Sequence, residues 1–127
     1  MKIIVLVPVY NDWKSVSKLI EEINSTVSNL NCNFSILIIN DASSEHQSIY
    51  APNLENIQSV QIINMKENRG HARCIASGLK HVFENEEFDY VIPMDGDGED
   101  RPEEIKNFVG YINYASDKPI VGERVKR

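Results

Sequence analysis

The sequence has few of the residues that mark several common classes of protein. Its two cysteines, Cys32 and Cys74, form no CxxC pair and no cluster with histidine, which argues against a zinc site and against a disulfide framework. This usage fits a reduced cytosolic setting in which both thiols fill apolar space. No apolar run is long enough to span a bilayer. We therefore expect a cytoplasmic protein that reaches the inner face of a membrane only through a partner.

Basic residues are also in the minority. Thirteen lysines and arginines face 19 acidic residues, which gives a net charge of −6. Nucleic-acid-binding surfaces are usually basic, so we expect no nucleic-acid partner. A bound nucleotide is still compatible with this charge, because a cation can neutralise its phosphates locally. The 127 residues, of which 42% are apolar and 25% charged, fit one compact α/β or other globular domain.

Glycine-rich phosphate loops are missing as well. The residues that follow the first apolar run, Pro8 to Asp12, contain no glycine. A dinucleotide-binding GxGxxG, a P-loop and the glycine-rich loop of a sugar nucleotidyltransferase are therefore excluded at this place. A DxD motif is present, but it follows the fourth apolar run. Haloacid-dehalogenase-type phosphatases carry theirs after the first strand, so that class is also disfavoured.

Short apolar runs alternate with amphipathic segments along the whole chain. The pattern predicts strands at 2–7, 34–39, 59–65 and 89–94, helices at 14–30, at 70–83 and from Pro102 onward, and a fifth strand that begins at 119–121. The third strand alternates more than the others, which indicates a place nearer the edge of the sheet. This order predicts a mainly parallel sheet flanked by helices, in which ligands bind beyond the carboxyl ends of the strands.

The predicted helices carry apolar stripes that should face the sheet. In the second helix we expect the buried stripe to comprise Ala72, Ile75, Ala76, Leu79, Val82 and Phe83. In the third helix we expect it to comprise Ile105, Phe108, Val109 and Ile112.

Polar residues follow every predicted strand. Turns favour such residues in any case, so one loop alone says little, whereas four loops that meet at one edge favour a binding site. The loops are, in chain order, Pro8-Val9-Tyr10-Asn11-Asp12, Asn40-Asp41-Ala42-Ser43-Ser44-Glu45, Lys66-Glu67-Asn68-Arg69-Gly70-His71 and Asp95-Gly96-Asp97-Gly98-Glu99-Asp100.

The fourth of these loops is the candidate metal site. Asp95 and Asp97 are one residue apart, so both carboxylates can approach one hard cation such as Mg²⁺ or Mn²⁺, which prefers oxygen ligands and leaves positions open for phosphate. Gly96 and Gly98 lower the steric cost of a backbone that comes close to phosphate. Acidic loops are common, but this one lies between an apolar strand and a helix opened by proline.

The other loops offer candidate contacts to a nucleotide, each beside a plainer interpretation. Asp41 can accept hydrogen bonds from a base or ribose, or it can form an Asx turn or a helix cap. Tyr10 can pack on a base or lie at the surface. Asn68 and Gly70 precede a helix whose free N–H groups favour phosphate. Three basic side chains there could add a donor to phosphate, although each alone is explained better as a solvated helix end: Arg69, His71 and Arg73.

These motifs resemble family 2 glycosyltransferases in order and spacing. The motifs that carry the resemblance are Pro8 to Asn11, Asn40 to Ser43, Asn68 to His71 with Gly78-Leu79, and Met94 to Glu103. The NRGH…GL and MDGDGEDRPE stretches look most like the branch that includes dolichyl- and undecaprenyl-phosphate sugar transferases. The resemblance covers nearly all of the chain.

The resemblance implies a Rossmann-like GT-A fold that binds a nucleoside-diphosphate-sugar of the UDP or GDP type. It implies that Pro8, Val9, Tyr10 and Asn11 line the nucleotide pocket, that Asp41 binds the base, and that the DxD motif handles the ribose and the metal-diphosphate, with Asp97 the more direct metal ligand. The implied reaction is metal-dependent transfer of a sugar, with inversion, to a polyprenyl phosphate or to a growing glycan in cell-wall or polysaccharide biosynthesis. No residue can be named as the general base.

Relatives of this kind continue beyond the strand that residues 119–124 resemble. We therefore expect residues 1–127 to form the N-terminal, donor-binding part of a GT-A domain, truncated after the DxD half. Two functions stay open on this basis: a glycosyltransferase, and a non-catalytic module that binds nucleotide-sugar and metal. We also expect a homo-oligomer, because a shortened domain leaves helix faces and a sheet edge uncovered.

Overall fold

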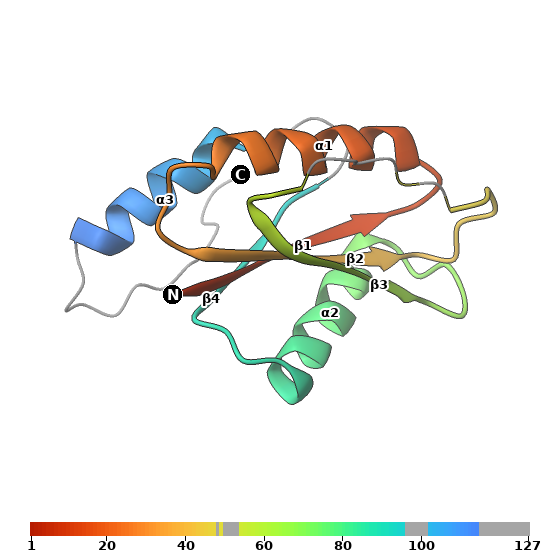
Figure 1. Ribbon diagram of the computed structural model, residues 1–127. Coiled ribbons are helices and arrows are strands. Elements are labelled where there is room, and N and C mark those ends of the chain that lie inside the picture. Colours follow the sequence, from red (N-terminus) through yellow and green to blue (C-terminus); the bar gives the residue numbers. More distant parts are fainter. Residues whose placement is uncertain (48, 50–53, 96–101, 115–127) are drawn as a thin grey trace.

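The computed structural model describes residues 1–47, 49, 54–95 and 102–114 of the chain. They form a four-stranded, all-parallel sheet in the order β3-β2-β1-β4. Helices α1 and α3 cover one face of the sheet and helix α2 covers the other (Figure 1). The elements are β1 (Lys2–Val9), α1 (Trp13–Thr26), β2 (Asn33–Asn40), β3 (Ile57–Asn64), α2 (His71–Asn85), β4 (Tyr90–Pro93) and α3 (Glu103–Tyr114). The α/β class with a mainly parallel sheet is thus confirmed.

The two central strands are buried on both faces. In β1 seven of eight residues are buried, and in β2 six of eight. Continuous apolar runs of this kind are typical of strands covered by helices on both sides. Strand β3 has one buried residue, Ile57, and is otherwise half-buried or exposed. It lies at the edge of the sheet, as its sequence pattern predicts. The predicted strand at 119–121 lies outside the described residues.

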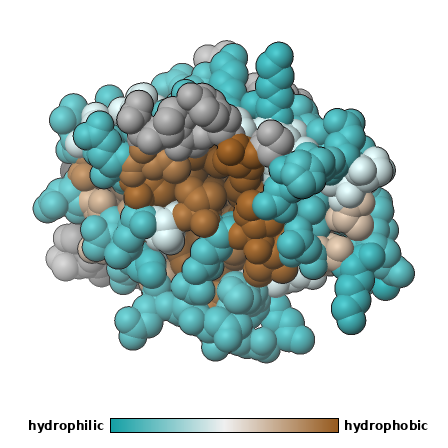
Figure 2. All heavy atoms as spheres, turned by 45° about the vertical axis from the view of Figure 1, so that its right-hand side comes forward, coloured by the Kyte–Doolittle hydropathy of each residue, from teal (hydrophilic) through white to brown (hydrophobic). Residues whose placement is uncertain are grey.

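The sheet divides the core into two layers. The larger layer lies under α1 and α3 and is built around Ile3, Val5, Ile36 and other fully buried side chains. The smaller layer lies under α2 and centres on Leu6, Ile39 and their neighbours. Figure 2 shows one face of the molecule, on which apolar surface gathers at the centre and is bordered by hydrophilic residues.

Helix α1 begins where the sequence predicts but ends earlier. The Asp12 side chain accepts a hydrogen bond from the Ser15 N–H at 3.4 Å, which caps the helix. The helix ends at Thr26 instead of continuing to Leu30, in a stretch of β-branched and small polar residues with low helix propensity. Val27 is still buried and Leu30 still packs against the core. The apolar spacing therefore continues past the end of the helix itself.

Helix α2 buries the predicted stripe only in part: Val82 is buried, and Ile75 and Leu79 pack against the core. Its buried residues are Cys74, Gly78 and Val82, whereas Phe83 is 70% exposed. A Cβ at Gly78 would lie 2.5 Å from the Leu6 Cδ1 atom. The helix thus rests on the sheet through its smallest residue, and Phe83 at its far end is left outside the contact. Ala72 and Ala76, which we also predicted to be buried, are exposed.

Helix α3 follows the prediction for the side chains that are described. Ile105 and Val109 are buried. Phe108 is half-buried, and its ring meets Tyr90 edge-on at 5.5 Å between centroids. Nothing is described for the side chain of Ile112. The helix carries Glu103 and Glu104 in its first turn, where negative charge stabilises the helix dipole.

The contact at Gly78 predicts that glycine-to-alanine substitutions at Gly78 and at Gly110 change the stability of the fold in opposite directions. Gly78→Ala should lower the free energy of unfolding by ~1–3 kcal/mol, because the added methyl overpacks a closed core. Gly110→Ala adds the same methyl to α3, where nothing lies within 4 Å, and should raise stability by ~0.5–1 kcal/mol. Urea denaturation of both variants measures the difference. Equal stabilisation by the two substitutions would show that α2 does not approach the sheet this closely.

Candidate functional site

The carboxyl ends of all four strands meet at one edge of the sheet. Backbone hydrogen bonds join each strand end to its neighbour: the Asp41 N–H donates to the Val9 carbonyl at 2.8 Å, and the Met94 N–H donates to the Leu6 carbonyl at 2.9 Å. In this sheet the strand order reverses between β1 and β4. The crevice outside such a reversal is where open α/β sheets bind ligands. The loops after β1 and β4 flank it.

Asn11 ties the loop after β1 to the loop after β2. Its backbone is left-handed, with φ of 63°, a conformation that asparagine tolerates better than most residues. Its N–H donates to the Ser43 Oγ at 2.8 Å and its Nδ2 to the Ser44 Oγ at 3.0 Å. Its Oδ1 accepts the Glu45 N–H at 2.9 Å. Asn11 thus fixes the relative position of two loops that flank the edge.

A pair of asparagines, Asn40 and Asn64, connects the ends of β2 and β3. The Asn40 Nδ2 donates to the Asn64 Oδ1 at 2.9 Å, and the Asn40 Oδ1 accepts the Ser43 N–H at 3.0 Å. Ala42 between them has a positive φ of 56°. Sequence reasoning did not assign a role to Asn40, Asn64 or the serines. The asparagine at the end of each of these two strands is the feature of the sequence that could have indicated the pair.

Asp41 is a buried carboxylate that fixes the loop leading into α2. The residue is 1% exposed. Its two oxygens accept the N–H groups of Arg69 at 2.7 Å and Gly70 at 2.9 Å, and its carbonyl accepts the Asn68 Nδ2 at 3.2 Å. The structure therefore gives Asp41 the role of a turn and helix-end anchor, one of the two that its sequence position left open. Its contact with a nucleotide base stays a prediction.

Cys74 completes this buried cluster. Burial, together with a hydrogen bond to Asp41 and the negative charge of that carboxylate, raises the pKa of the Cys74 thiol from 9.0 to about 12. The thiol therefore stays protonated and donates its hydrogen to the carboxylate. The sequence analysis treated Cys74 as an apolar filler, and its burial is confirmed. Its polar contact was missed because Asp41 lies 33 residues earlier in the chain.

The start of α2 faces the reversal point. Gly70 forms the N-cap with a φ of 89°, and within the described chain no side chain caps this helix end. Its first N–H groups are thus the kind that bind phosphate. His71 follows, and its Nδ1 lies 3.7 Å from the Asp95 Oδ1. This contact brings the start of α2 next to the residue that follows β4.

The DxD motif is described only in its first residue. The Asp95 side chain is 37% exposed at the carboxyl end of the sheet, so the structure places it where the sequence predicts. Asp97 and Gly96 lie outside the described residues. Asp95 offers a carboxylate oxygen, the type of ligand that Mg²⁺ and Mn²⁺ prefer, so its chemistry fits one position of a cation site. Among the described residues, no three His, Cys, Asp or Glu side chains gather closely enough to hold a metal ion.

The predicted pocket residues after β1 differ in their exposure. Pro8 and Val9 belong to β1 and are buried, so they support the edge from within. Tyr10 is 44% exposed and is available to a ligand. Asn68 is exposed beside the start of α2. The structure thus brings Tyr10, Asn11, Asp95 and the start of α2 to one edge, with Asp41 beneath the loop.

Comparison with known proteins agrees with this arrangement. Residues 4–127 match the sequence profile of the family described as Glycosyl transferase family 2. The chain belongs to that family. Within the described residues, no helix combines the length and hydropathy that a membrane crossing requires.

The fold of this family 2 chain is also found among solved structures. The crystal structure of S. aureus TarS 1-349 matches with a TM-score of 0.58 at 19% identity, and it covers 100% of this chain and 39% of that chain. The same protein in complex with UDP-GlcNAc matches with a TM-score of 0.59 at 18% identity, covering 100% and 37%, and the complex with UDP matches with 0.59 at 19%. The chain thus spans about two fifths of these proteins, and at this identity the likeness shows the GT-A fold alone.

Removing the charge of Asp41 should loosen the start of α2. Asp41→Asn keeps the shape but places an NH₂ group against a backbone N–H, so we expect a loss of about 2 kcal/mol in the free energy of unfolding. Hydrogen exchange should show faster exchange at Arg69 and Gly70. Glu84→Asn, an exposed acid further along α2, serves as the control. Unchanged exchange at both amides would contradict the hydrogen-bond assignment.

The two cysteines should differ in reactivity. In the folded protein at pH 8 we expect a thiol reagent to label Cys32, which is half-buried, and to leave Cys74 unmodified. Because the folded-state pKa of Cys74 exceeds its ordinary value, the protonated thiol stabilises the fold below about pH 9, and that contribution is lost as the pH rises toward about 12. Mass spectrometry of labelled peptides checks the site, with Cys32→Ser as control. Rapid labelling of Cys74 in folded protein would refute its buried, protonated state.

Proposed function

We propose that this domain binds a nucleoside-diphosphate-sugar and transfers the sugar to an acceptor. The observation that carries the proposal is the pairing of Asp95 with His71 at 3.7 Å, beside the strand-order reversal between β1 and β4. It places a carboxylate suited to a cation next to a helix start suited to phosphate. A diphosphate is the group that needs both. Membership of glycosyl transferase family 2 supports the same reading.

The arrangement suggests how the donor lies. The diphosphate would rest between the start of α2 at Gly70 and the carboxylate of Asp95, with Asp97 as the further metal ligand. The base would extend over the ends of β1 and β2, where the exposed ring of Tyr10 offers a stacking surface. The TarS structures that share this fold hold UDP-GlcNAc or UDP, which supports a UDP-type donor, with a GDP-type donor as the alternative.

The proposed chemistry is an in-line displacement. An acceptor oxygen forms a bond to the anomeric carbon of the sugar while the bond from that carbon to the diphosphate oxygen breaks, which inverts the configuration. A bound Mg²⁺ or Mn²⁺ supplies positive charge that stabilises the departing diphosphate. The chain's own groups hold the diphosphate in place through backbone N–H groups and orient the cation through carboxylate oxygens. We assign no residue as the general base.

The proposed acceptor is drawn from two sequence motifs. The NRGH…GL and MDGDGEDRPE stretches support a polyprenyl phosphate acceptor, and a growing polysaccharide is the alternative. Such an acceptor would place the protein at the inner face of a membrane through a partner. These assignments rest on the sequence resemblance.

Donor binding can be tested by thermal shift and calorimetry with UDP, GDP and CDP, each with and without Mn²⁺. A ligand at 100 times its dissociation constant stabilises the folded state by about 2.7 kcal/mol. We expect one nucleotide to stabilise the protein, and only with metal. Asp97→Ala should weaken that binding by about tenfold or more, because the diphosphate loses its counter-charge. Glu84→Ala, an exposed acid on α2 away from the edge, should bind as the wild type does.

A transfer assay distinguishes a glycosyltransferase from a module that only binds the donor. Release of nucleoside diphosphate in the presence of an acceptor would establish the enzyme. Metal-dependent binding without transfer or donor hydrolysis, in folded protein, would limit the function to donor binding. Binding that is unchanged in Asp97→Ala would reject the metal assignment altogether.

A further inference from the structure

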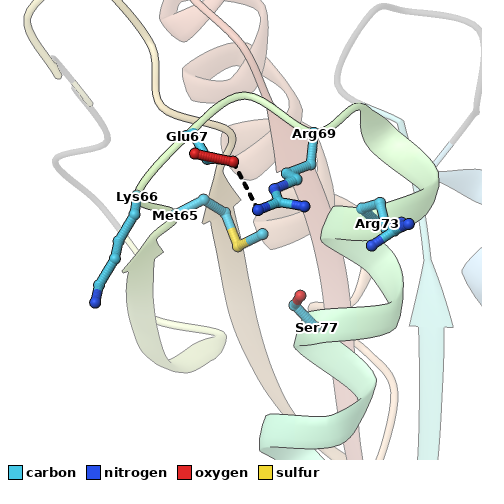
Figure 3. Close-up of a pocket in the computed structure, with 6 residues that line it drawn as sticks. All are labelled: Met65, Lys66, Glu67, Arg69, Arg73 and Ser77. Carbon is cyan, nitrogen blue, oxygen red and sulfur yellow. Dashed lines mark ion pairs between the residues drawn. The ribbon is translucent and has the colours of Figure 1, made fainter.

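A polar hollow lies on the opposite side of α2 from Asp95. It has a volume of about 250 Å³ and opens between the carboxyl end of β3 and the first two turns of α2. Figure 3 shows the side chains of Arg69 and Ser77 reaching toward this space, with Arg73 beside them and Lys66 pointing away. Its lining consists of Met65, Lys66, Glu67, Arg69, Arg73 and Ser77.

The hollow carries an excess of positive charge in an acidic chain. Because Lys66 points away from this space, the charged side chains beside it are Arg69, Arg73 and Glu67. Two are cationic and one is anionic, which leaves one positive charge in a protein with a net charge of −6. Glu67 neutralises Arg69 through an ion pair at 2.6 Å. Among the described residues, Arg73 forms no ion pair. A compact anion is the ligand that this uncompensated guanidinium favours.

We propose that this hollow, lined by Arg69, Arg73 and Ser77, binds a phosphomonoester group. A phosphate dianion presents three terminal oxygens, which can accept from two guanidinium forks and a hydroxyl together. Arg73 and Ser77 are four residues apart on α2 and therefore share one face of the helix. Met65 forms an apolar floor against which a sugar or acyl stem of the ligand packs.

The site is separate from the donor edge. Residues two apart on a helix point in nearly opposite directions, about 200° apart, so His71 faces Asp95 while Arg73 faces the hollow. Strands β3 and β4 are three strand spacings apart, which is about 14 Å. A phosphate in the hollow therefore does not share the cation expected at Asp95. The basic residues around the start of α2 divide between two sites.

Inorganic phosphate is the probe for this site. We expect calorimetry to show metal-independent phosphate binding that Arg73→Gln weakens about tenfold, equivalent to about 1.4 kcal/mol. Glu67→Gln should strengthen the binding, because it releases Arg69 from its ion pair. Lys106→Gln removes the same charge as Arg73→Gln from an exposed position on α3, across the sheet, and should change nothing.

A second set of variants separates this site from the donor site. Phosphate binding that survives in Asp95→Asn and Asp97→Ala supports the proposal, whatever those variants do to nucleotide binding. Binding that is lost in Asp97→Ala but retained in Arg73→Gln would place the phosphate at the donor edge and overturn it. Equal affinity in the wild type, Arg73→Gln and Glu67→Gln would also overturn it.

The source of the phosphate group can be resolved in the same system. Phosphatidylcholine vesicles with and without phosphatidate present the group on a lipid, and glucose 1-phosphate presents it in solution. Binding to phosphatidate vesicles that Arg73→Gln abolishes identifies a lipid headgroup as the source. Binding of only the soluble phosphates identifies a soluble metabolite. Binding of neither, with no response to inorganic phosphate, would exclude the site.

Discussion

The burial of β1 on both faces is the constraint from which the rest of the architecture follows. A strand with seven of eight residues buried needs a helix layer above and below, and its neighbours must then be reached by helical crossovers. Such connections are right-handed in almost all proteins. With β2 and β3 added on one side of β1 and β4 on the other, α1 and α2 fall on opposite faces. Every loop that follows a strand consequently opens on the same edge.

The polar chemistry of that edge is organised mainly by short side chains that bind backbone. Asn11 accepts the Glu45 N–H, Asn40 donates to Asn64, and Asp41 accepts the Arg69 N–H, so each connects the end of one strand to the next. Asp41 is the most demanding of these, because a buried carboxylate is costly unless its oxygens are satisfied. Two backbone N–H groups and a thiol satisfy it here. The start of α2 is thereby held in place without a capping side chain of its own.

Much of the fold could be predicted from local sequence. The continuous apolar runs of β1 and β2 and the alternation in β3 report burial directly, so the strands, their parallel arrangement and the edge position of β3 were accessible. The buried face of α2 was accessible only in part, because Val82, Ile75 and Leu79 meet the core as predicted whereas Phe83 is exposed. Hydrophobicity ranks Phe83 above Gly78, but the close approach of helix to sheet depends on volume at the contact with Leu6. The end of α1 was likewise hidden, because Leu30 stays in the core after the helix has stopped.

The candidate site was predictable in its location and less so in its contacts. Strand-end positions of Tyr10, Asn11, Asp41 and Asp95 follow from the sheet. The partners of Asp41 lie 28 and 29 residues away, and no local pattern reveals a pairing of that length. Helix geometry alone predicts that His71 and Arg73 point in different directions. The hollow beside Arg73, however, is formed by β3 and α2 together, so it could not be predicted before both were placed.

The hydrogen bonds made by Asn11 have a consequence for molecular recognition. Its contacts to Ser43, Ser44 and Glu45 join the two loops through groups of the protein itself. The two loops are therefore preorganised, and the loss of their conformational entropy accompanies folding. A small molecule that docks against them retains more of its intrinsic binding energy, since little of it is consumed in ordering the receptor. This rigidity also favours molecules that match the existing shape over those that require the loops to adapt.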